Sequence, residues 1–241
     1  MTDQKLFPHS TPEQLAEGVW RIVGQLPFPL LRNMIVVRLK DGGLLLHSLV
    51  ALDDTGMAAL EKLGQPKIAI VPHKAHQMDV PFYRKRYPDL QILTRRDAMA
   101  DIKPQGIING TVEDVLPGLG FTLHDAPGIK VGEYGYQFTL QGGGQAVILC
   151  DAFASGHAYH PDKFMSKILE PLLGGTKGKF GLARIYRWFI VRKPADLMEF
   201  GRKLAEIPDL RLLTVSHGDP LTGDVAAQLR AALGVGGARV H

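Results

Sequence analysis

The sequence of 241 residues has a single cysteine and no long hydrophobic run. With only Cys150, a disulfide within the chain is excluded. The N-terminus, Met1 to Lys5, is polar and lacks the apolar segment of a signal peptide. No apolar run approaches the ~18 residues that a membrane-spanning helix needs. These absences predict a reduced, cytoplasmic protein with no membrane span.

Two common catalytic motifs are also missing. The sequence contains no G-x-S-x-G, so a serine nucleophile of the α/β-hydrolase type is not indicated. The glycine triplet 142–144 is not followed by Lys-Ser or Lys-Thr, and it therefore predicts a hairpin turn rather than a phosphate loop. Cys150 lies in an apolar segment, which favours a structural role for its thiol.

The overall charge is only mildly basic. The chain has 28 Lys and Arg against 24 Asp and Glu, a formal net charge of +4. Such a balance is compatible with an anionic small-molecule substrate and gives little support for a nucleic-acid partner. The oligomeric state leaves no signal in the sequence.

Three apolar segments each end in side chains that can bind a metal. One segment runs into Asp151 and another, further along the chain, into His217. A third, Ile68–Pro72, runs into the loop 73–79, which carries His73, His76 and Asp79. Ligands at strand ends can converge at the rim of a sheet, so the pattern predicts a metal site there.

The order of predicted elements indicates two sheets with helices outside. A loose lead-in over residues 1–14 is followed by one domain, so that residues 1–241 form a single unit. Strands are predicted at Gly18–Val23, Met34–Leu39, Leu44–His47, Lys67–Val71, Gln91–Leu93, Gly120–His124, Tyr134–Leu140, Ala146–Cys150 and Leu210–Val215. Helices are predicted from Asp53 or Asp54 to Leu63, and at Pro81–Tyr87, Arg95–Ala100, Pro194–Ile207 and Thr222–Leu233, the last capped by Thr222.

These residues resemble the metallo-β-lactamase superfamily from about Leu15 to Leu233. The resemblance implies a four-layer αββα sandwich of two mixed β-sheets with the site along one sheet edge. Asp151 matches the family's bridging Asp, and His217 matches its last His. The family's H-x-H-x-D-H loop corresponds to residues 73–80 with wider spacing, and Val80 stands where its last His would be.

Other positions depart from the family pattern. Ile129 follows Pro127-Gly128 where a His ligand is expected, and His47-Ser48 replaces the Asp after the third strand. An uncharacterised sub-branch is more similar, because its members share the His-Ser strand end and a Val-x-Pro-Asn/His-Lys-x-His loop. They also share Pro-Gly-x-x-x-Gly-Glu, present here as residues 127–133.

The resemblance and the strand ends together give a predicted ligand set of His73, His76, Asp79, Asp151 and His217. Such a set suits one zinc or iron ion, although the histidines of a degenerate family member can also remain without any metal. Asp79 and Asp151 are the catalytic candidates, because a carboxylate can orient a metal-activated water or accept its proton. His157 and His160 follow Asp151 closely, so they are either replacement ligands or part of an exposed loop.

A basic segment lies between residues 176 and 193. It has no acidic residue, and its aromatic side chains alternate with Lys and Arg. Arg184 and Arg187 are therefore predicted to bind an anionic substrate. The alternative is an amphipathic helix that packs its aromatic residues on the core.

Three functions are compatible with these features. The first is a metallo-hydrolase in which metal-activated water attacks an ester, thioester, amide or phosphoester. The alternative is a catalytically degenerate member that binds an anionic ligand or a partner protein, suggested by the ligands missing at Val80 and Ile129. A redox or oxygen-handling iron site is a third reading.

Overall fold

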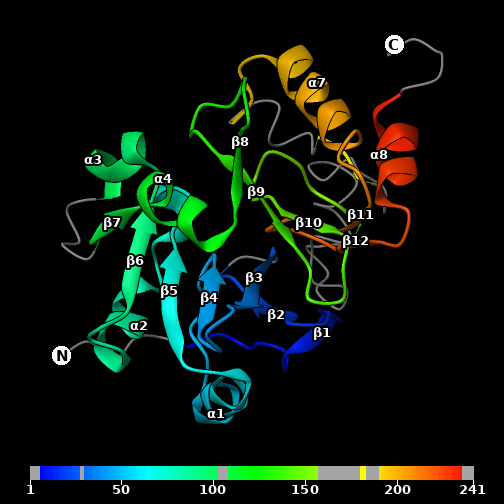
Figure 1. Cartoon of the computed structure of the whole chain (residues 1–241). Helices are drawn as coiled ribbons and strands as arrows, with labels where there is room; N and C mark the ends of the chain where they lie inside the picture. The colour runs from blue at the N-terminus through cyan, green and yellow to red at the C-terminus, as the bar shows by residue number, and fades with distance from the viewer. Residues whose placement is uncertain (1–5, 28–29, 103–107, 157–179, 183–189, 235–241) are drawn as a thin grey trace.

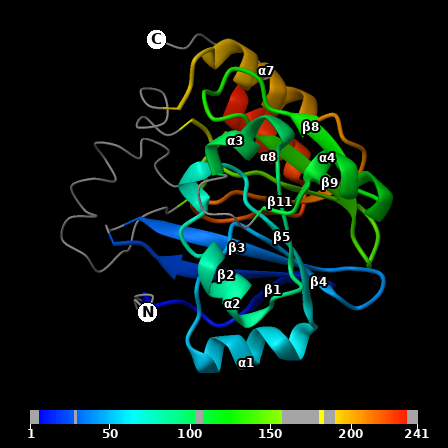
Figure 2. The same cartoon turned by 90° about the vertical axis from the view of Figure 1, so that its left-hand side faces the viewer.

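The structure is a computed structural model that describes residues 6–27, 30–102, 108–156, 180–182 and 190–234. Its described strands form two sheets that face each other, with helices on both outer sides (Figures 1 and 2). No helix among these residues combines the length and apolar character needed to cross a membrane.

The first sheet follows the order of the sequence. Its strands are β1 (Glu13–Ala16), β2 (Val19–Gln25), β3 (Leu31–Arg38), β4 (Leu44–His47), β5 (Pro66–Ile70), β6 (Gln91–Thr94) and β7 (Gly110–Thr111). Neighbours from β1 to β4 are antiparallel, and those from β4 to β7 are parallel.

The second sheet has the order β12-β11-β10-β9-β8. Its strands are β12 (Leu221–Thr222), β11 (Leu210–Thr214), β10 (Gln145–Ile148), β9 (Tyr134–Thr139) and β8 (Thr122–Asp125). Among the described strands of this sheet, β10 and β11 run parallel and the other neighbours antiparallel, so this sheet is mixed as well.

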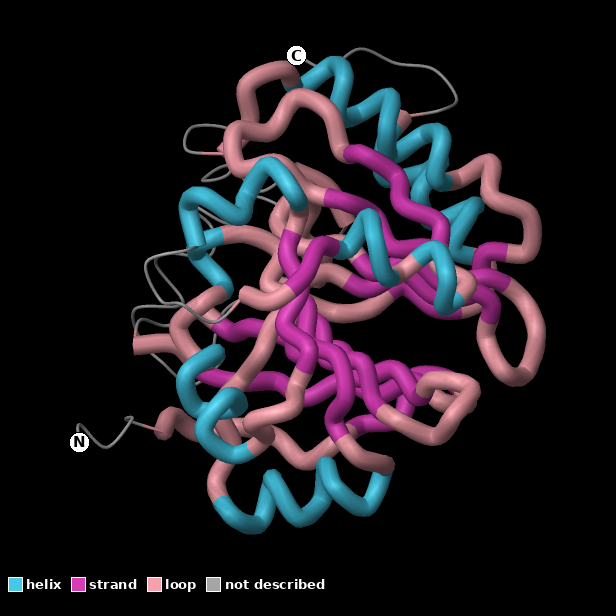
Figure 3. Tube along the Cα trace, turned by 60° about the vertical axis from the view of Figure 1, so that its left-hand side comes forward, coloured by secondary structure: helices cyan, strands magenta, loops and turns pink. Residues whose placement is uncertain are grey.

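Helices and short turns connect and cover the strands. They are α1 (Asp54–Leu63), α2 (Val80–Arg86), α3 (Met99–Ile102), α4 (Val112–Val115), α7 (Pro194–Leu204) and α8 (Val225–Leu233), with the 3-10 turns η1 (Lys74–His76), η2 (Arg96–Ala98) and η4 (Pro117–Leu119). Helices α1 and α2 lie outside the first sheet, whereas α7 and α8 lie outside the second (Figures 2 and 3).

Alternating side chains explain why the strands are apolar on both faces. In β4, Leu45 belongs to the core between the sheets, whereas Leu44 and Leu46 pack in the core beneath α1. In the second sheet, Ile148 faces the inner core and Val147 packs with the residues of α7 and α8. Strands covered on both sides read as continuous hydrophobic runs. The predicted four-layer αββα arrangement is thereby confirmed.

Two predicted boundaries were wrong. Residues 13 and 14, assigned to the lead-in, belong to β1, which pairs with β2 and is joined to it by the ion pair between Glu13 and Arg21. Thr222 belongs to β12 and pairs with Leu212 of β11, so it is a strand residue and does not cap the helix. Helix α8 begins at Val225, and the carboxylate of Asp224 accepts a hydrogen bond from the Ala227 N–H at 2.9 Å.

Asn33 ties the two sheets together beside the strand ends. Its side-chain amide donates to the carbonyl oxygens of Val215 at 2.8 Å and Gly218 at 2.7 Å. Its backbone N–H donates to the carbonyl of Ser216 at 2.8 Å. One buried residue of β3 therefore holds the segment that follows β11.

We predict that Asn33→Ala lowers the free energy of unfolding by about 2–3 kcal/mol, because two buried carbonyls lose their donor. Urea denaturation measures the change. The control is Gln14→Ala, which removes an exposed side-chain amide from β1 and is expected to change stability by less than about 0.5 kcal/mol. Equal effects of the two substitutions would contradict the role of Asn33.

Candidate metal centre

Four predicted ligands meet at one edge of the sandwich. His73 and His76 follow β5 in the first sheet, while Asp151 follows β10 and His217 follows β11 in the second. All four side chains are buried. Strand ends that share a sheet edge bring these distant residues together, as the sequence pattern predicts.

Cys150 is a further member of the cluster. Its Sγ lies 3.6 Å from Nε2 of His73 and 3.4 Å from Nε2 of His76. Strand β10 ends at Ile148, so Cys150 lies beyond the strand, and its thiol faces the site and not a purely apolar core. One ligand atom from each of His73, His76, Cys150 and Asp151 lies within 4.8 Å of the others.

The spacing of these atoms suits a metal ion. Oδ2 of Asp151 lies 3.1 Å from Nε2 of His73 and 3.4 Å from Nε2 of His76. With the two thiol distances, the measured separations range from 3.1 to 3.6 Å. Tetrahedral zinc with bonds of about 2.0–2.3 Å holds its ligand atoms roughly 3.3–3.6 Å apart. Three of these four separations fall in that range, and the 3.1 Å between His73 and Asp151 is the length of a hydrogen bond. The four residues could therefore close around one ion.

Two histidines are oriented as metal ligands usually are. His217 Nδ1 donates to the carbonyl oxygen of Leu31 at 2.6 Å, and its Nε2 lies 3.3 Å from Oδ1 of Asp151. His76 Nδ1 contacts the hydroxyl of Ser48 at 2.7 Å, and its Nε2 faces the cluster. A second hydrogen bond that fixes the ring is typical of metal-binding histidines.

His73 has the opposite orientation. Its Nδ1 accepts from the Ala75 N–H at 3.3 Å, so the proton of the neutral ring is on Nε2, toward Asp151. A metal at this nitrogen would have to displace that proton.

The charge of the cluster centres on Asp151. Burial raises the pKa of this carboxyl, but His76, His217 and His73 outweigh burial and hold the pKa well below its usual range. Burial lowers the pKa of His76 to about 4, so its ring is neutral. Burial also raises the pKa of the Cys150 thiol, which a bound cation would deprotonate.

The chain is similar to several solved structures of metallo-β-lactamases. A metallo-β-lactamase from Erythrobacter litoralis is 16% identical, with 93% of this chain and 96% of that chain covered at a TM-score of 0.59. FIM-1 from Pseudomonas aeruginosa, in its mono-zinc form, is 12% identical, with coverage of 97% and 98% and a TM-score of 0.59. DIM-1 is 10% identical, with coverage of 95% and 99% and a TM-score of 0.60.

The chain has the metallo-β-lactamase fold. No protein-family model and no curated protein matches the sequence.

Within this fold, Asp79 lies outside the four-residue cluster. Its carboxylate is ion-paired with the guanidinium of Arg32 on β3. Asp79 stands at the start of α2, and its role as a metal ligand stays a prediction. The predicted residues His157, His160, Arg184 and Arg187 lie outside the described residues.

Ser48 orients the ring of His76, a role that the sequence pattern His47-Ser48 did not predict. Its φ of 61° lies in the left-handed region, where a residue other than glycine is uncommon. This conformation accompanies the hydrogen bond between its hydroxyl and Nδ1 of His76. Backbone strain of this kind is concentrated at functional sites.

Glu133 holds the loop that carries two of the ligands. Its fully buried carboxylate accepts hydrogen bonds from the backbone N–H groups of Cys150 at 2.5 Å, Asp151 at 2.7 Å and Ala152 at 2.8 Å. Burial and the charge of Asp151 raise the pKa of Glu133 to about 7, against the effect of these bonds. The Pro-Gly-x-x-x-Gly-Glu motif is the sequence signal for this residue.

The backbone after His217 requires glycine at position 218. Its φ is 106°, and a Cβ at this position would lie 1.4 Å from the carbonyl oxygen of Ser155. The chain after His217 therefore passes against backbone that leaves no room for a side chain.

A small cavity adjoins the cluster, and we call it the site cavity. Its volume is about 170 Å³. Its polar wall is formed by Arg32, His76, Asp151 and His217, and its apolar wall by Leu26, Leu30 and Ala75. The cluster is therefore reached from the side of Asp151.

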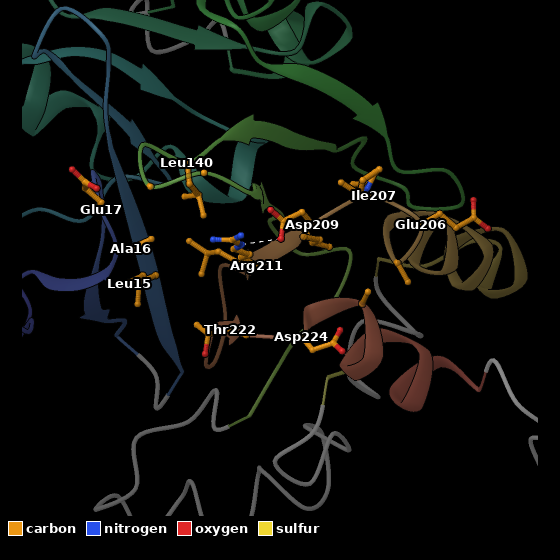
Figure 4. Close-up of a pocket in the computed structure, with 18 of the residues that line it drawn as sticks. Leu15, Ala16, Glu17, Leu140, Glu206, Ile207, Asp209, Arg211, Thr222 and Asp224 are labelled. Atoms are coloured by element: carbon orange, nitrogen blue, oxygen red, sulfur yellow. Dashed lines mark hydrogen bonds and ion pairs between the residues drawn. The ribbon is translucent and has the colours of Figure 1, made fainter.

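A larger cavity of about 800 Å³ lies at the other end of the strands (Figure 4). It is lined by the end of β1, the β9–β10 turn, the segment from Ala205 to the start of β11, and the residues around the start of α8. Arg211 pairs with Asp209 at 2.8 Å, and Arg230 donates to the Ala205 carbonyl at 2.9 Å. These charged groups are already partnered, so the larger cavity shows no sign of the chemistry found at the cluster.

We predict that Glu133→Gln lowers metal affinity about 10- to 100-fold, because an amide cannot accept all three backbone bonds and the ligand loop shifts. Stability should fall by about 2–3 kcal/mol. Zinc titration and urea denaturation measure the two effects, and Glu17→Gln, an exposed and otherwise matched change, should alter neither. Wild-type zinc affinity in Glu133→Gln would show that the loop does not depend on this carboxylate.

Proposed function

We propose that this protein is a metal-dependent hydrolase of a small ester, thioester, amide or phosphoester. The observation that supports it is the buried cluster of His73, His76, Cys150 and Asp151, whose ligand atoms all lie within 4.8 Å of one another. The site cavity that reaches Asp151 supplies space for a reactant.

These four residues would hold one ion, with His217 as a neighbour on the cavity side. When bound, a metal of this kind polarises a carbonyl or phosphoryl oxygen and lowers the pKa of water toward neutrality. Asp151 is ionised, so it supplies the charge that retains a cation. Nε2 of His217 lies 3.3 Å from Oδ1 of the same carboxylate, and the ring lines the site cavity.

The donor set favours zinc over iron. A thiolate with imidazole nitrogens in tetrahedral geometry is typical of zinc, whereas mononuclear iron oxygenases use two histidines and a carboxylate with open positions. Cys150 therefore shifts the expected metal toward zinc.

The structural neighbours support metal binding in this fold. All three are named metallo-β-lactamases, and FIM-1 is in a mono-zinc form. At 10–16% identity, we carry over to this chain the metal and not the β-lactam substrate.

One observation favours the non-catalytic alternative. Four buried protein donors fill a tetrahedral zinc ion, as in structural sites, whereas catalytic sites keep one position open. In that case the metal would stabilise the strand ends, and the site cavity would bind a ligand without turnover.

We predict about one zinc ion per chain by elemental analysis of protein purified without a His tag or chelator. Asp151→Asn and Cys150→Ser should lose most of it, because each removes a donor. Asp79→Asn is the matched control and should retain the metal, since Arg32 binds that carboxylate. Absence of metal uptake, or retention of full zinc by Asp151→Asn, would refute the metal centre.

We further predict turnover of at least one class among esters, thioesters and phosphoesters by the zinc-loaded protein, and loss of about 100-fold or more in Asp151→Asn. The screen is read as initial rates with and without chelator. Full zinc occupancy with no turnover in any class would favour the closed, non-catalytic site.

A further inference from the structure

Arg32 is a buried cation whose hydrogen-bonding capacity is only partly used. It is the second residue of β3 and is 3% exposed. Its Nη2 donates to the carboxylate of Asp79. Its Nε and Nη1 are buried and have no hydrogen-bond partner among the described residues.

Unused donors of this kind point to a missing partner. A guanidinium carries N–H donors on all three nitrogens and no acceptor, so every one of them needs an oxygen when it is removed from water. Buried polar groups in folded proteins are nearly always hydrogen-bonded. The unmet groups of Arg32 therefore call for a water molecule or a ligand oxygen.

The position of Arg32 favours a ligand. The side chain lines the site cavity together with His76, Asp151 and His217, so a molecule bound to it would lie beside the cluster. About 170 Å³ corresponds to roughly five water molecules at ~30 Å³ each. This space is below the roughly 300–1,000 Å³ of pockets for drug-sized ligands. A small molecule, or the end of a larger one, would fill it.

We propose that Arg32 binds the anionic group of the substrate, and that the substrate class is a small molecule bearing a carboxylate or a phosphate. Its reaction in the site cavity rests on the proposed function, whereas anion binding by Arg32 does not. Both groups suit Arg32, because their oxygens accept hydrogen bonds and a guanidinium has only donors. The apolar residues Leu26 and Leu30 exclude water on the other side of the cavity.

Asp79 sets the strength of this interaction. Because its carboxylate already pairs with Nη2, it neutralises part of the charge of Arg32 while leaving Nε and Nη1 free. Hydrogen bonds then contribute most of the binding of an anion, because the ion pair with Asp79 weakens the Coulombic attraction. Removing the Asp79 charge should strengthen binding.

The test uses sodium phosphate and sodium acetate as probes, with sodium chloride at matched ionic strength as the reference. Binding is measured by calorimetry on both metal-free and zinc-loaded protein. The variants are Arg32→Gln, Asp79→Asn and, as the control, Arg38→Gln. Arg38 lies on the same strand and donates to the Leu63 carbonyl, away from the site cavity.

We expect at least one probe to bind the wild-type protein and Arg38→Gln equally, and Arg32→Gln about tenfold or more weakly. Asp79→Asn should bind it more tightly. Preference for acetate assigns a carboxylate, and preference for phosphate assigns a phosphate. If Arg32→Gln does not fold, the increase in Asp79→Asn remains the deciding result.

Equal binding by wild type and Arg32→Gln, no binding of either probe to any protein form, or no increase in Asp79→Asn would each overturn the proposal. Metal content and turnover are measured separately, so a protein that binds anions through Arg32 but takes up no zinc would refute the proposed hydrolase and leave the role of Arg32 standing.

Discussion

The carboxylate of Asp151 is the group on which the two sheets converge. His73 and His76 approach it from the first sheet, and His217 approaches from the second. Burying an ionised carboxylate costs several kcal/mol unless charges and hydrogen bonds compensate for it. The surrounding histidines, and the backbone N–H of Asp151 held by Glu133, fix where the carboxylate lies. The strand ends are therefore held around a preformed pocket of negative charge that suits a cation.

The support for this arrangement extends beyond the ligands themselves. Ser48 and Leu31 orient the rings of His76 and His217, while Asn33 holds the backbone on both sides of His217. Each supporting bond crosses between distant parts of the sequence. The site and the packing of the two sheets are thus parts of one network, and a change in either is expected to alter the other.

Much of the fold follows from local patterns. Apolar runs between turn residues located most strands, and Asp53 caps α1 with a 2.7 Å bond to the Gly56 N–H, as its position before the helix predicts. The position of His73, His76, Asp151 and His217 after apolar strands also predicted that they meet at one site. This pattern does not include the contact of Asp79 with Arg32, because the two lie 47 residues apart in sequence and only folding brings them together.

The remaining features depend on tertiary contacts that no local pattern contains. Cys150 looked like an apolar strand residue, yet β10 ends two residues earlier and turns its thiol toward the histidines. Thr222 resembles a helix cap, but pairing with Leu212 makes it part of a strand. Arg32 lies in a hydrophobic strand. Only the folded structure shows that two of its nitrogens lack a partner among the described residues and that its side chain lines the site cavity.

The most direct test of the metal centre is anomalous diffraction at the zinc edge, from crystals grown with zinc. The account predicts one anomalous peak, within about 2.0–2.3 Å of donor atoms from His73, His76, Cys150 and Asp151. A peak elsewhere, or none in crystals that contain zinc, would contradict it.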